Sequence, residues 1–115
     1  MNEDLRPFLP LSPATLHILL ALAGGDLHGY AIMQVVARQS EGQYKLGPGT
    51  LYDNLQKMMQ QGMVENAPGP AVAGDDPRRR YYRLTSFGQR LLSMEVTRLE
   101  NVVREARLHL APATD

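Results

Sequence analysis

The sequence predicts a mainly α, α+β domain in which three short helices precede a β-hairpin and one long helix follows it. Two observations support this order. Apolar residues recur at helical spacing in four segments, and two short strand-like stretches, separated by a proline- and glycine-rich run, lie between the third and the fourth. The 115 residues suffice for one domain with a small core.

The composition excludes several classes of protein. The absence of cysteine excludes disulfides, thiolate metal sites and a cysteine nucleophile. The start of the chain is acidic and broken by prolines, unlike a signal peptide. The longest apolar run, residues 18–23, is far shorter than the roughly 20 residues that a membrane span needs. We therefore expect a soluble, cytoplasmic protein that does not contact a membrane.

Two short helices are expected first. Ser12 and Pro13 suit the N-cap and the first position of a helix that ends at Gly24. Asp26 is expected to cap a second helix, which runs from about residue 27 or 28 to residue 40. The apolar residues expected to face the core are Leu16, Leu19, Leu20, Ala23, Ile32, Val35 and Val36.

A third helix is expected from about Gly49 to Gln61, with two faces of different character. The apolar face carries Leu51, Leu55, Met58 and Met59, with Tyr52 at its edge. The polar face carries Thr50, Asp53, Gln56, Lys57 and Gln60. Amide side chains can hydrogen-bond base edges in the major groove of DNA, but a face of this composition can also simply be solvated.

A β-hairpin follows the third helix. Its strands are expected at Met63–Asn66 and Arg79–Leu84, on either side of a loop of residues 67–77. Alternation along the second strand predicts one side that faces the core and one that faces outward. The core-facing residues are Tyr82 and Leu84, and the outward-facing residues are Arg79, Tyr81 and Arg83.

The net charge is zero, but residues 77–115 carry eight arginines against four Asp and Glu, whereas residues 1–76 carry four Lys and Arg against eight. Three of the arginines, residues 78–80, adjoin the returning strand of the hairpin. Such a cluster attracts a polyanion locally, although it can also be a solvated charge run. The neighbouring Asp75 and Asp76 could pair with these arginines, but we favour a solvated turn.

The last helix is expected from about Ser86 to Leu110, with Thr85 as its cap. The residues expected to pack back on the domain are Phe87, Leu91 and Met94. A second apolar row follows heptad spacing and consists of Leu92, Val96, Leu99, Val103, Ala106 and Leu110. Because a domain of this size has little left to cover that row, we expect a homodimer interface there, with packing inside one chain as the alternative.

Nothing in the sequence favours an enzyme. It contains no nucleophile elbow, no phosphate-binding glycine loop and no HExxH motif. The three histidines are scattered and have no acidic neighbours at ligand spacing, so we expect no metal site and no cofactor. His17 is expected at a helix surface, and His28 is expected to be a cap or a packing residue.

Three helices followed by a hairpin with a basic edge are the element order of a winged helix-turn-helix, in which the third helix enters the major groove and the wing contacts phosphates. Three segments also resemble the PadR family of bacterial transcriptional regulators, in that family's order and near its spacing. They are residues 27–30 (LHGY), 47–52 (GPGTLY) and 80–88 (RYYRLTSFG). The resemblance covers roughly residues 12–107 and is strongest to the smaller subfamily, which has a single C-terminal helix.

The resemblance implies a homodimeric repressor that binds a pseudo-palindromic operator in double-stranded DNA. It places Thr50 and Tyr52 near the N-terminal end of the recognition helix and makes Tyr30 a structural residue packed between helices. The residues expected to contact DNA are Thr50, Tyr52, Asn54, Gln56, Lys57, Gln60, Arg78, Arg79 and Arg80. Some relatives respond to phenolic acids or flat cationic drugs, so relief by a small aromatic or cationic effector is a further expectation.

The expected organisation is an N-terminal tail over residues 1–11, a DNA-binding domain over 12–85, a dimerisation helix over 86–110 and a tail over 111–115. The recognition helix contains only one basic residue, Lys57, and neutralised phosphates supply most non-specific affinity for DNA. A second interpretation therefore stays open, in which the chain is a winged-helix module that binds another protein and no specific DNA.

Overall fold

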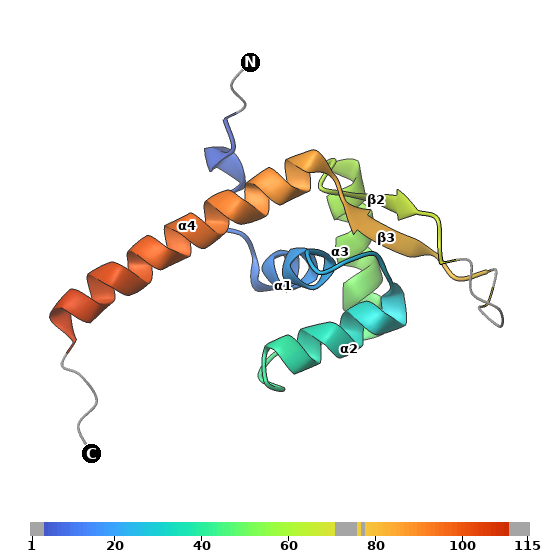
Figure 1. Cartoon of the computed structure of the whole chain (residues 1–115), viewed down its shortest axis with the longest axis horizontal. Helices are drawn as coiled ribbons and strands as arrows, with labels where there is room; N and C mark the ends of the chain where they lie inside the picture. The colour runs from blue at the N-terminus through green and yellow to red at the C-terminus, as the bar shows by residue number, and fades with distance from the viewer. Residues whose placement is uncertain (1–3, 71–75, 77, 111–115) are drawn as a thin grey trace.

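The computed structural model describes residues 4–70, 76 and 78–110, and it has the predicted fold class (Figure 1). In chain order, the elements are η1 (Arg6–Phe8), α1 (Pro13–Leu22), β1 (Leu27–His28), α2 (Gly29–Gln39), α3 (Pro48–Gln60), β2 (Val64–Ala67), β3 (Tyr81–Leu84) and α4 (Ser86–His109). The four predicted helices and the hairpin are confirmed. The 3-10 turn η1 and the two-residue strand β1 were not predicted.

The N-terminal caps of α1 and α4 are those that the sequence predicts. The side-chain oxygen of Ser12 accepts a hydrogen bond from the backbone N–H of Thr15 at 3.2 Å. The side-chain oxygen of Thr85 accepts one from the N–H of Gly88 at 3.0 Å. Each bond satisfies an N–H group that the start of a helix leaves without a partner inside the helix.

The start of α2 differs from the prediction. Leu27 and His28 form a strand instead of the first helical residues, so α2 begins at Gly29. Its cap is His28, whose Nδ1 atom accepts a hydrogen bond from the N–H of Ala31 at 3.2 Å. The expectation that Asp26 caps this helix is therefore wrong, because strand pairing moves the helix start further along the chain.

The three strands form an antiparallel sheet in the order β1-β3-β2, so β3 is the central strand. Tyr82 lies opposite Leu27 and is buried, as predicted. Tyr81, predicted to face outward, is buried as well. Pairing with β1 brings the ring of His28 against the Tyr81 ring at a centroid distance of 5.4 Å, and Gly69 lies on the same tyrosine ring. The prediction for Tyr81 is wrong because it considered a hairpin of two strands.

The core lies around α1, which contacts α2, α3, α4 and β3 (Figure 1). The largest fully buried apolar side chains are Ile18, Leu19, Ile32, Val36, Leu51, Leu55, Met58 and Leu91. Leu20 and Ala23, which the sequence places on the core face of α1, are exposed, and Ala21 and Leu22 are buried instead. The buried face of α1 is rotated from the predicted one because the helix is covered from several sides at once.

We call β2, β3 and the residues between them the wing. Hydrogen bonds close the base of the wing between the two neighbouring helices. The N–H of Thr85 donates to the carbonyl oxygen of Met63 at 3.1 Å, and the Thr85 hydroxyl donates to that of Gly62. Gly88 in α4 packs so closely on the wing that a Cβ atom there would overlap the Met63 carbonyl oxygen. These contacts hold the wing between the end of α3 and the start of α4.

The segment predicted as an N-terminal tail packs on the domain from Leu5 onward. Leu5 belongs to the core, and the Phe8 ring meets the Phe87 ring edge-on at a centroid distance of 5.3 Å. The buried carboxylate of Glu95 in α4 accepts a hydrogen bond from the N–H of Leu11 at 2.8 Å. This segment is thus tied to α4 by both apolar packing and a buried hydrogen bond.

Two further side chains lie elsewhere than predicted. Met94 was expected to pack on the domain, but it is partly exposed beside Leu9 and Pro10. His17 was expected at a helix surface, but it is half-buried and stacks on Tyr44 with ring centroids 4.5 Å apart. Both differences result from tertiary contacts. The N-terminal segment packs beside Met94, and the connection between α2 and α3 packs on His17.

The Glu95 carboxylate generates a prediction about stability and pH. Arg98 donates two hydrogen bonds to it, and together with the Leu11 N–H it holds the pKa of Glu95 below the ordinary 4.5, although burial opposes this. As the pH falls below about 4.5, the unfolded chain therefore takes up a proton before the folded one does. The stability that Glu95 contributes is present above that pH and is lost as the pH falls through the lower folded pKa.

We expect Glu95→Gln to lower the free energy of unfolding at pH 7 by about 1–3 kcal/mol, because the Arg98 guanidinium and the Leu11 N–H lose a charged acceptor. The loss should shrink at pH 3.5, because below the ordinary pKa of 4.5 the unfolded wild type takes up a proton at Glu95 and the stability that the folded carboxylate contributes diminishes. Urea unfolding at both pH values measures this. Glu105→Gln, on the exposed side of α4, is the control and should change little. An equal loss at both pH values would contradict the assignment.

Candidate nucleic-acid interface

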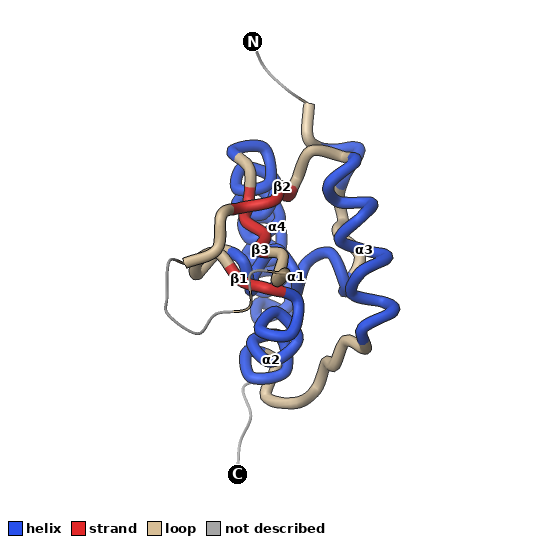
Figure 2. Tube along the Cα trace, turned by 90° about the vertical axis from the view of Figure 1, so that its right-hand side faces the viewer, coloured by secondary structure: helices blue, strands red, loops and turns tan. Residues whose placement is uncertain are grey.

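The third helix stands at one side of the molecule with its outer face uncovered (Figure 2). Its inner face is buried and consists of Leu51, Leu55 and Met58. The predicted DNA-contacting residues on its outer face are exposed, and they are Thr50, Tyr52, Gln56, Lys57 and Gln60. Asn54 is different, because it is half-buried and its amide donates to the Thr50 carbonyl oxygen at 2.8 Å within the helix. The structure therefore presents five of these six side chains to solvent together.

The charge on α3 is small. Lys57 is its only cation and Asp53 its only acid, so the helix by itself attracts a polyanion weakly. Its N-terminus is favourable, however. The N-cap is Gly47, which has no side chain to bond the first N–H groups, so these and the positive end of the helix dipole are open to an anion. Most of the positive charge must come from outside α3.

The wing supplies that charge. Arg78, Arg79 and Arg80 are exposed and directly precede β3. Asp76 accepts a hydrogen bond from the backbone N–H of Arg78 at 2.9 Å and further bonds from its guanidinium at 3.2 and 3.4 Å. These bonds lower the pKa of the Asp76 carboxyl. The expectation of a merely solvated turn is thus wrong for Asp76, and Asp75 lies outside the described residues.

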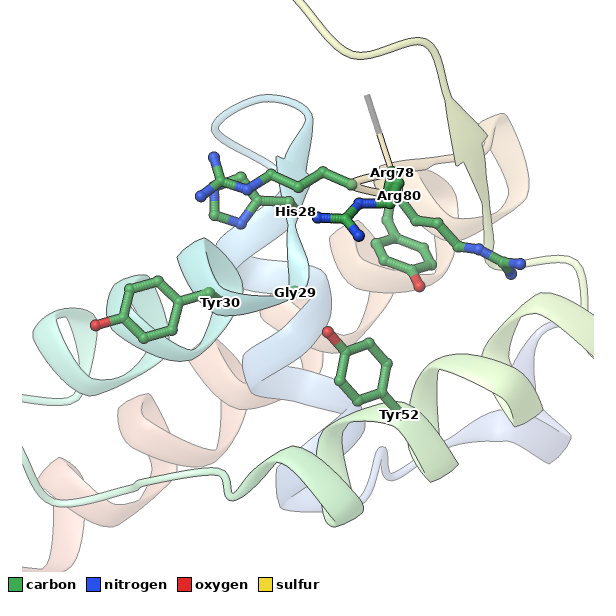
Figure 3. Close-up of a pocket in the computed structure, with 8 residues that line it drawn as sticks. His28, Gly29, Tyr30, Tyr52, Arg78 and Arg80 are labelled. Atoms are coloured by element: carbon green, nitrogen blue, oxygen red, sulfur yellow. The ribbon is translucent and has the colours of Figure 1, made fainter. Parts of the chain in front are cut away.

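The wing arginines and the N-terminal ends of α2 and α3 surround one cavity of about 400 Å³ (Figure 3). We call it the wing cavity. Its lining residues are His28, Gly29, Tyr30, Tyr52, Arg78, Arg79, Arg80 and Tyr82. Each of the three sequence segments that resemble the PadR family contributes to it. None of the lining residues is acidic.

Tyr52 reaches from α3 across to α2. Its hydroxyl occupies the space beside Gly29, where an added Cβ atom would overlap both the hydroxyl and the ring. Figure 3 shows Tyr52 pointing at Gly29, whereas Tyr30 points away along α2. Tyr30 is 61% exposed, so the expectation that its ring packs between helices is wrong. The sterically constrained residue of the LHGY segment is therefore Gly29, because only glycine leaves room for the Tyr52 side chain.

Tyr82 also lines the wing cavity, and sequence analysis missed it as a site residue by placing it in the core. The residue is 6% exposed as a whole, but its hydroxyl is not one of the described buried polar atoms that lack a partner, so the hydroxyl is accessible from the cavity. Burial raises the pKa of Tyr82, the neighbouring Tyr52 phenol raises it further and Arg80 partly offsets the rise. At neutral pH the hydroxyl is therefore protonated and can donate a hydrogen bond into the cavity.

His28 and Gly29 were also absent from the predicted site. The motif that contains them was a usable signal, but alternation and helical periodicity do not show that it lies beside the wing.

Metal chemistry has no support in the described part of the chain, where no group of three or more His, Cys, Asp or Glu residues could hold an ion.

A second surface runs along α4, which extends beyond the other helices (Figure 1). Of the predicted dimer residues, Leu92 is buried in the core of its own chain and Leu99 and Ala106 are half-buried. The remaining three, Val96, Val103 and Leu110, are exposed. Val96, Leu99 and Val103 line a shallow, largely apolar hollow of about 520 Å³, together with Glu100, Arg104 and Arg107. No helix in the described residues is long and apolar enough to cross a membrane.

Three helices with an uncovered third helix, followed by a wing that carries arginines, define a winged helix-turn-helix protein. The chain belongs to the transcriptional regulator PadR-like family, whose model matches residues 18–94. This is the family that the three segments resemble, and it is a family of regulators and not of enzymes.

Individual relatives agree with this assignment. The chain is 32% identical to the transcriptional regulator Rv3488 of Mycobacterium tuberculosis over 90 residues, and this matched region covers 78% of each protein. Its fold is similar to a PadR family transcription regulator of Clostridium difficile, with a TM-score of 0.70 and 22% identity over 87% of this chain and 100% of that one. It is also similar to Bacillus subtilis PadR in complex with operator DNA, with a TM-score of 0.61 and 19% identity over 92% of this chain and 52% of that one.

The Asp76–Arg78 pair generates a prediction about DNA affinity. We expect Asp76→Asn to strengthen DNA binding about two- to fivefold at low salt, since an exposed ion pair is weak and its loss frees Arg78 for phosphates. The gain should diminish as salt screens the charges. A binding titration at two salt concentrations measures both effects.

The chain offers a matched control. Asp4 pairs with Arg6 at the same spacing of two residues, with a side-chain bond of 2.9 Å, but in the N-terminal segment. Asp4→Asn should leave DNA affinity unchanged. Equal gains from both variants would show a general charge effect and exclude a specific role for Asp76.

Proposed function

We propose that this protein is a homodimeric transcriptional repressor that places α3 in the DNA major groove and the wing arginines on the backbone. The observation that carries the proposal is the wing cavity, around which the start of α3 and Arg78–Arg80 lie together. A groove-reading helix and a phosphate-binding element must reach the same duplex at once, and this arrangement allows it. The solved complex of Bacillus subtilis PadR with operator DNA, which shares the fold, supports it.

Base recognition is assigned to the exposed amides and the lysine of α3. Gln56 and Gln60 can donate to and accept from an adenine edge, and Lys57 can donate to guanine acceptors. Asn54 contributes less to this proposal than the sequence suggests, because its amide is already bonded to the Thr50 carbonyl oxygen.

Dimerisation is assigned to the apolar row of α4. The exposed valines and leucine of that row need a cover, and a second copy of the same helix offers a matching heptad row. A two-fold dimer would bind a pseudo-palindromic operator with one half-site for each α3. The hollow beside Val96 and Val103 is largely apolar, and its charged residues are Glu100, Arg104 and Arg107, so an aromatic effector that relieves repression would fit there better than a cationic one.

Selection from random DNA with the purified protein, at two salt concentrations, tests this function. An inverted repeat that survives the higher salt supports a dimeric, sequence-specific regulator and defines its operator. Binding that is lost with salt and shows no consensus contradicts it. The second candidate, a winged-helix module that binds a protein, would then be favoured by the weakly charged α3.

The wing generates a prediction about salt dependence. Replacing Arg78, Arg79 and Arg80 by alanine should weaken binding to all sequences alike and lower the slope of log affinity against log salt by about one for each lost phosphate contact. Titrations of operator and random DNA between about 50 and 200 mM salt measure this slope, because phosphate contacts change the affinity strongly over that range. Arg6→Ala, in the N-terminal segment, is the control. An unchanged slope in the triple variant would exclude the wing from phosphate binding.

The α4 row generates a prediction about assembly. Val103 is 48% exposed, so Val103→Glu should leave the fold intact and yield monomers by placing a charge in the interface. Sedimentation together with circular dichroism separates dissociation from unfolding. Leu99→Glu should have the same effect but can also disturb the fold, since Leu99 is half-buried. Asn101→Glu is the control, because it places the same charge outside the apolar row, and this variant should remain a dimer. A dimeric Val103→Glu protein would contradict the proposed interface.

A further inference from the structure

Several hydrogen-bond donors line the wing cavity. Tyr52 and Tyr82 each bring a phenol to it, and Arg80 lies close enough to lower the pKa of Tyr82. The Tyr82 residue is 6% exposed as a whole, but its hydroxyl is not one of the described buried polar atoms that lack a partner, so the hydroxyl is accessible from the cavity that the residue lines. A phenol hydroxyl that opens into a cavity lined by arginines can donate to a ligand that carries an acceptor.

The charged residues that line the cavity are all arginines, one of which, Arg78, is paired with Asp76 outside the lining. Its lining includes Arg78, Arg79 and Arg80 and no carboxylate. It also includes His28 at the start of α2, whose Nδ1 atom accepts from the Ala31 N–H. The proton of the neutral ring is therefore on Nε2, which leaves a further donor. The positive end of the α2 dipole lies at the same place. The cavity is thus complementary to an oxyanion.

We propose that the wing cavity binds one backbone phosphate of the DNA, with the hydroxyls of Tyr52 and Tyr82 as donors and the wing arginines as the source of positive charge. The proposal rests on the proposed function and deepens it. It assigns Tyr82, a strand residue that sequence analysis placed in the core, a direct role in fixing the duplex between α2, α3 and the wing. A phosphate held there sets the depth and register at which α3 enters the groove.

The close approach of α2 and α3 is part of the same site. Gly29 leaves the space that the Tyr52 hydroxyl occupies, and any larger residue at position 29 displaces that hydroxyl. Tyr52 is itself half exposed, and its hydroxyl is the end of a side chain that can rotate, so the displacement moves the phenol and not the backbone of the helix. Gly29 is thus a positioning residue for the phosphate donor.

Removal of the two hydroxyls tests the proposal. Tyr52→Phe and Tyr82→Phe should each weaken operator binding about tenfold, because each removes a hydrogen bond to a charged group. The salt slope should stay unchanged, because no charge is lost. Tyr44→Phe is the matched control, since Tyr44 stacks on His17 and does not line the wing cavity. It should bind as the wild type does.

Methylphosphonate substitution identifies the phosphate. An operator in which one backbone phosphate at a time is made neutral should reveal a position in each half-site where the substitution weakens the wild type but no longer weakens the Tyr82→Phe protein. If the wild type binds the operator and no position shows this coupling, the proposal is wrong while the proposed function stands. If the wild type selects no operator, the proposed function itself fails.

Two further measurements test the positioning role of Gly29 and the identity of the bound oxyanion. Gly29→Ala should weaken operator binding in the wild type. In the Tyr52→Phe background it should cause little further loss of affinity, because the donor that it displaces is already absent. Equal losses of affinity in both backgrounds would overturn the role of Gly29. Pyrophosphate, compared with chloride at equal ionic strength, tests a free phosphate as the occupant. Competition by pyrophosphate that depends on Tyr82, without any coupled backbone position, would overturn the assignment to DNA.

Discussion

The pairing of β3 with β1 is the interaction on which the rest of the arrangement depends. Only two residues, Leu27 and His28, form β1, yet their pairing with Tyr82 and Tyr81 brings the start of α2 to the base of the wing. Without it, the hairpin would contact α1, α3 and α4 but not the start of α2, and the arginines before β3 would lie at no defined place relative to α2. Strand pairing thus converts three separate sequence segments into one cavity.

The same constraint explains how a chain of zero net charge can present a basic surface. The eight arginines of the C-terminal part are divided equally between the wing and α4, and the three that precede β3 line a cavity with no acidic lining residue. Asp76 balances Arg78 in the free protein, and Glu65 pairs with Arg83 at 2.7 Å across β2 and β3. Electrostatic attraction is therefore local, as weak overall charge requires.

The C-terminal half of α4 is held apart from this site by a different set of contacts. The N-terminal segment packs beside its first turns through Phe8 and through the Leu11 hydrogen bond to Glu95. The apolar row of the second half then remains uncovered in one chain. In the proposed dimer, the length of α4 would set the separation of the two recognition helices, and the hydrogen bond from Leu11 to Glu95 would help fix how each domain is attached to α4.

The sequence by itself determined the order and type of the main elements, because these depend on local signals: apolar spacing, the caps Ser12 and Thr85, and glycines after helices. It also determined the family, through three short segments. Tertiary structure alone decided that Leu27 and His28 form a strand, that Tyr81 is buried, that Leu5 joins the core and that Tyr82 opens into a cavity. Each of these depends on contacts between residues far apart in the chain, which no local pattern records. The site is therefore predictable in its arginines and its α3 face, but not in the tyrosines and glycine that give it shape.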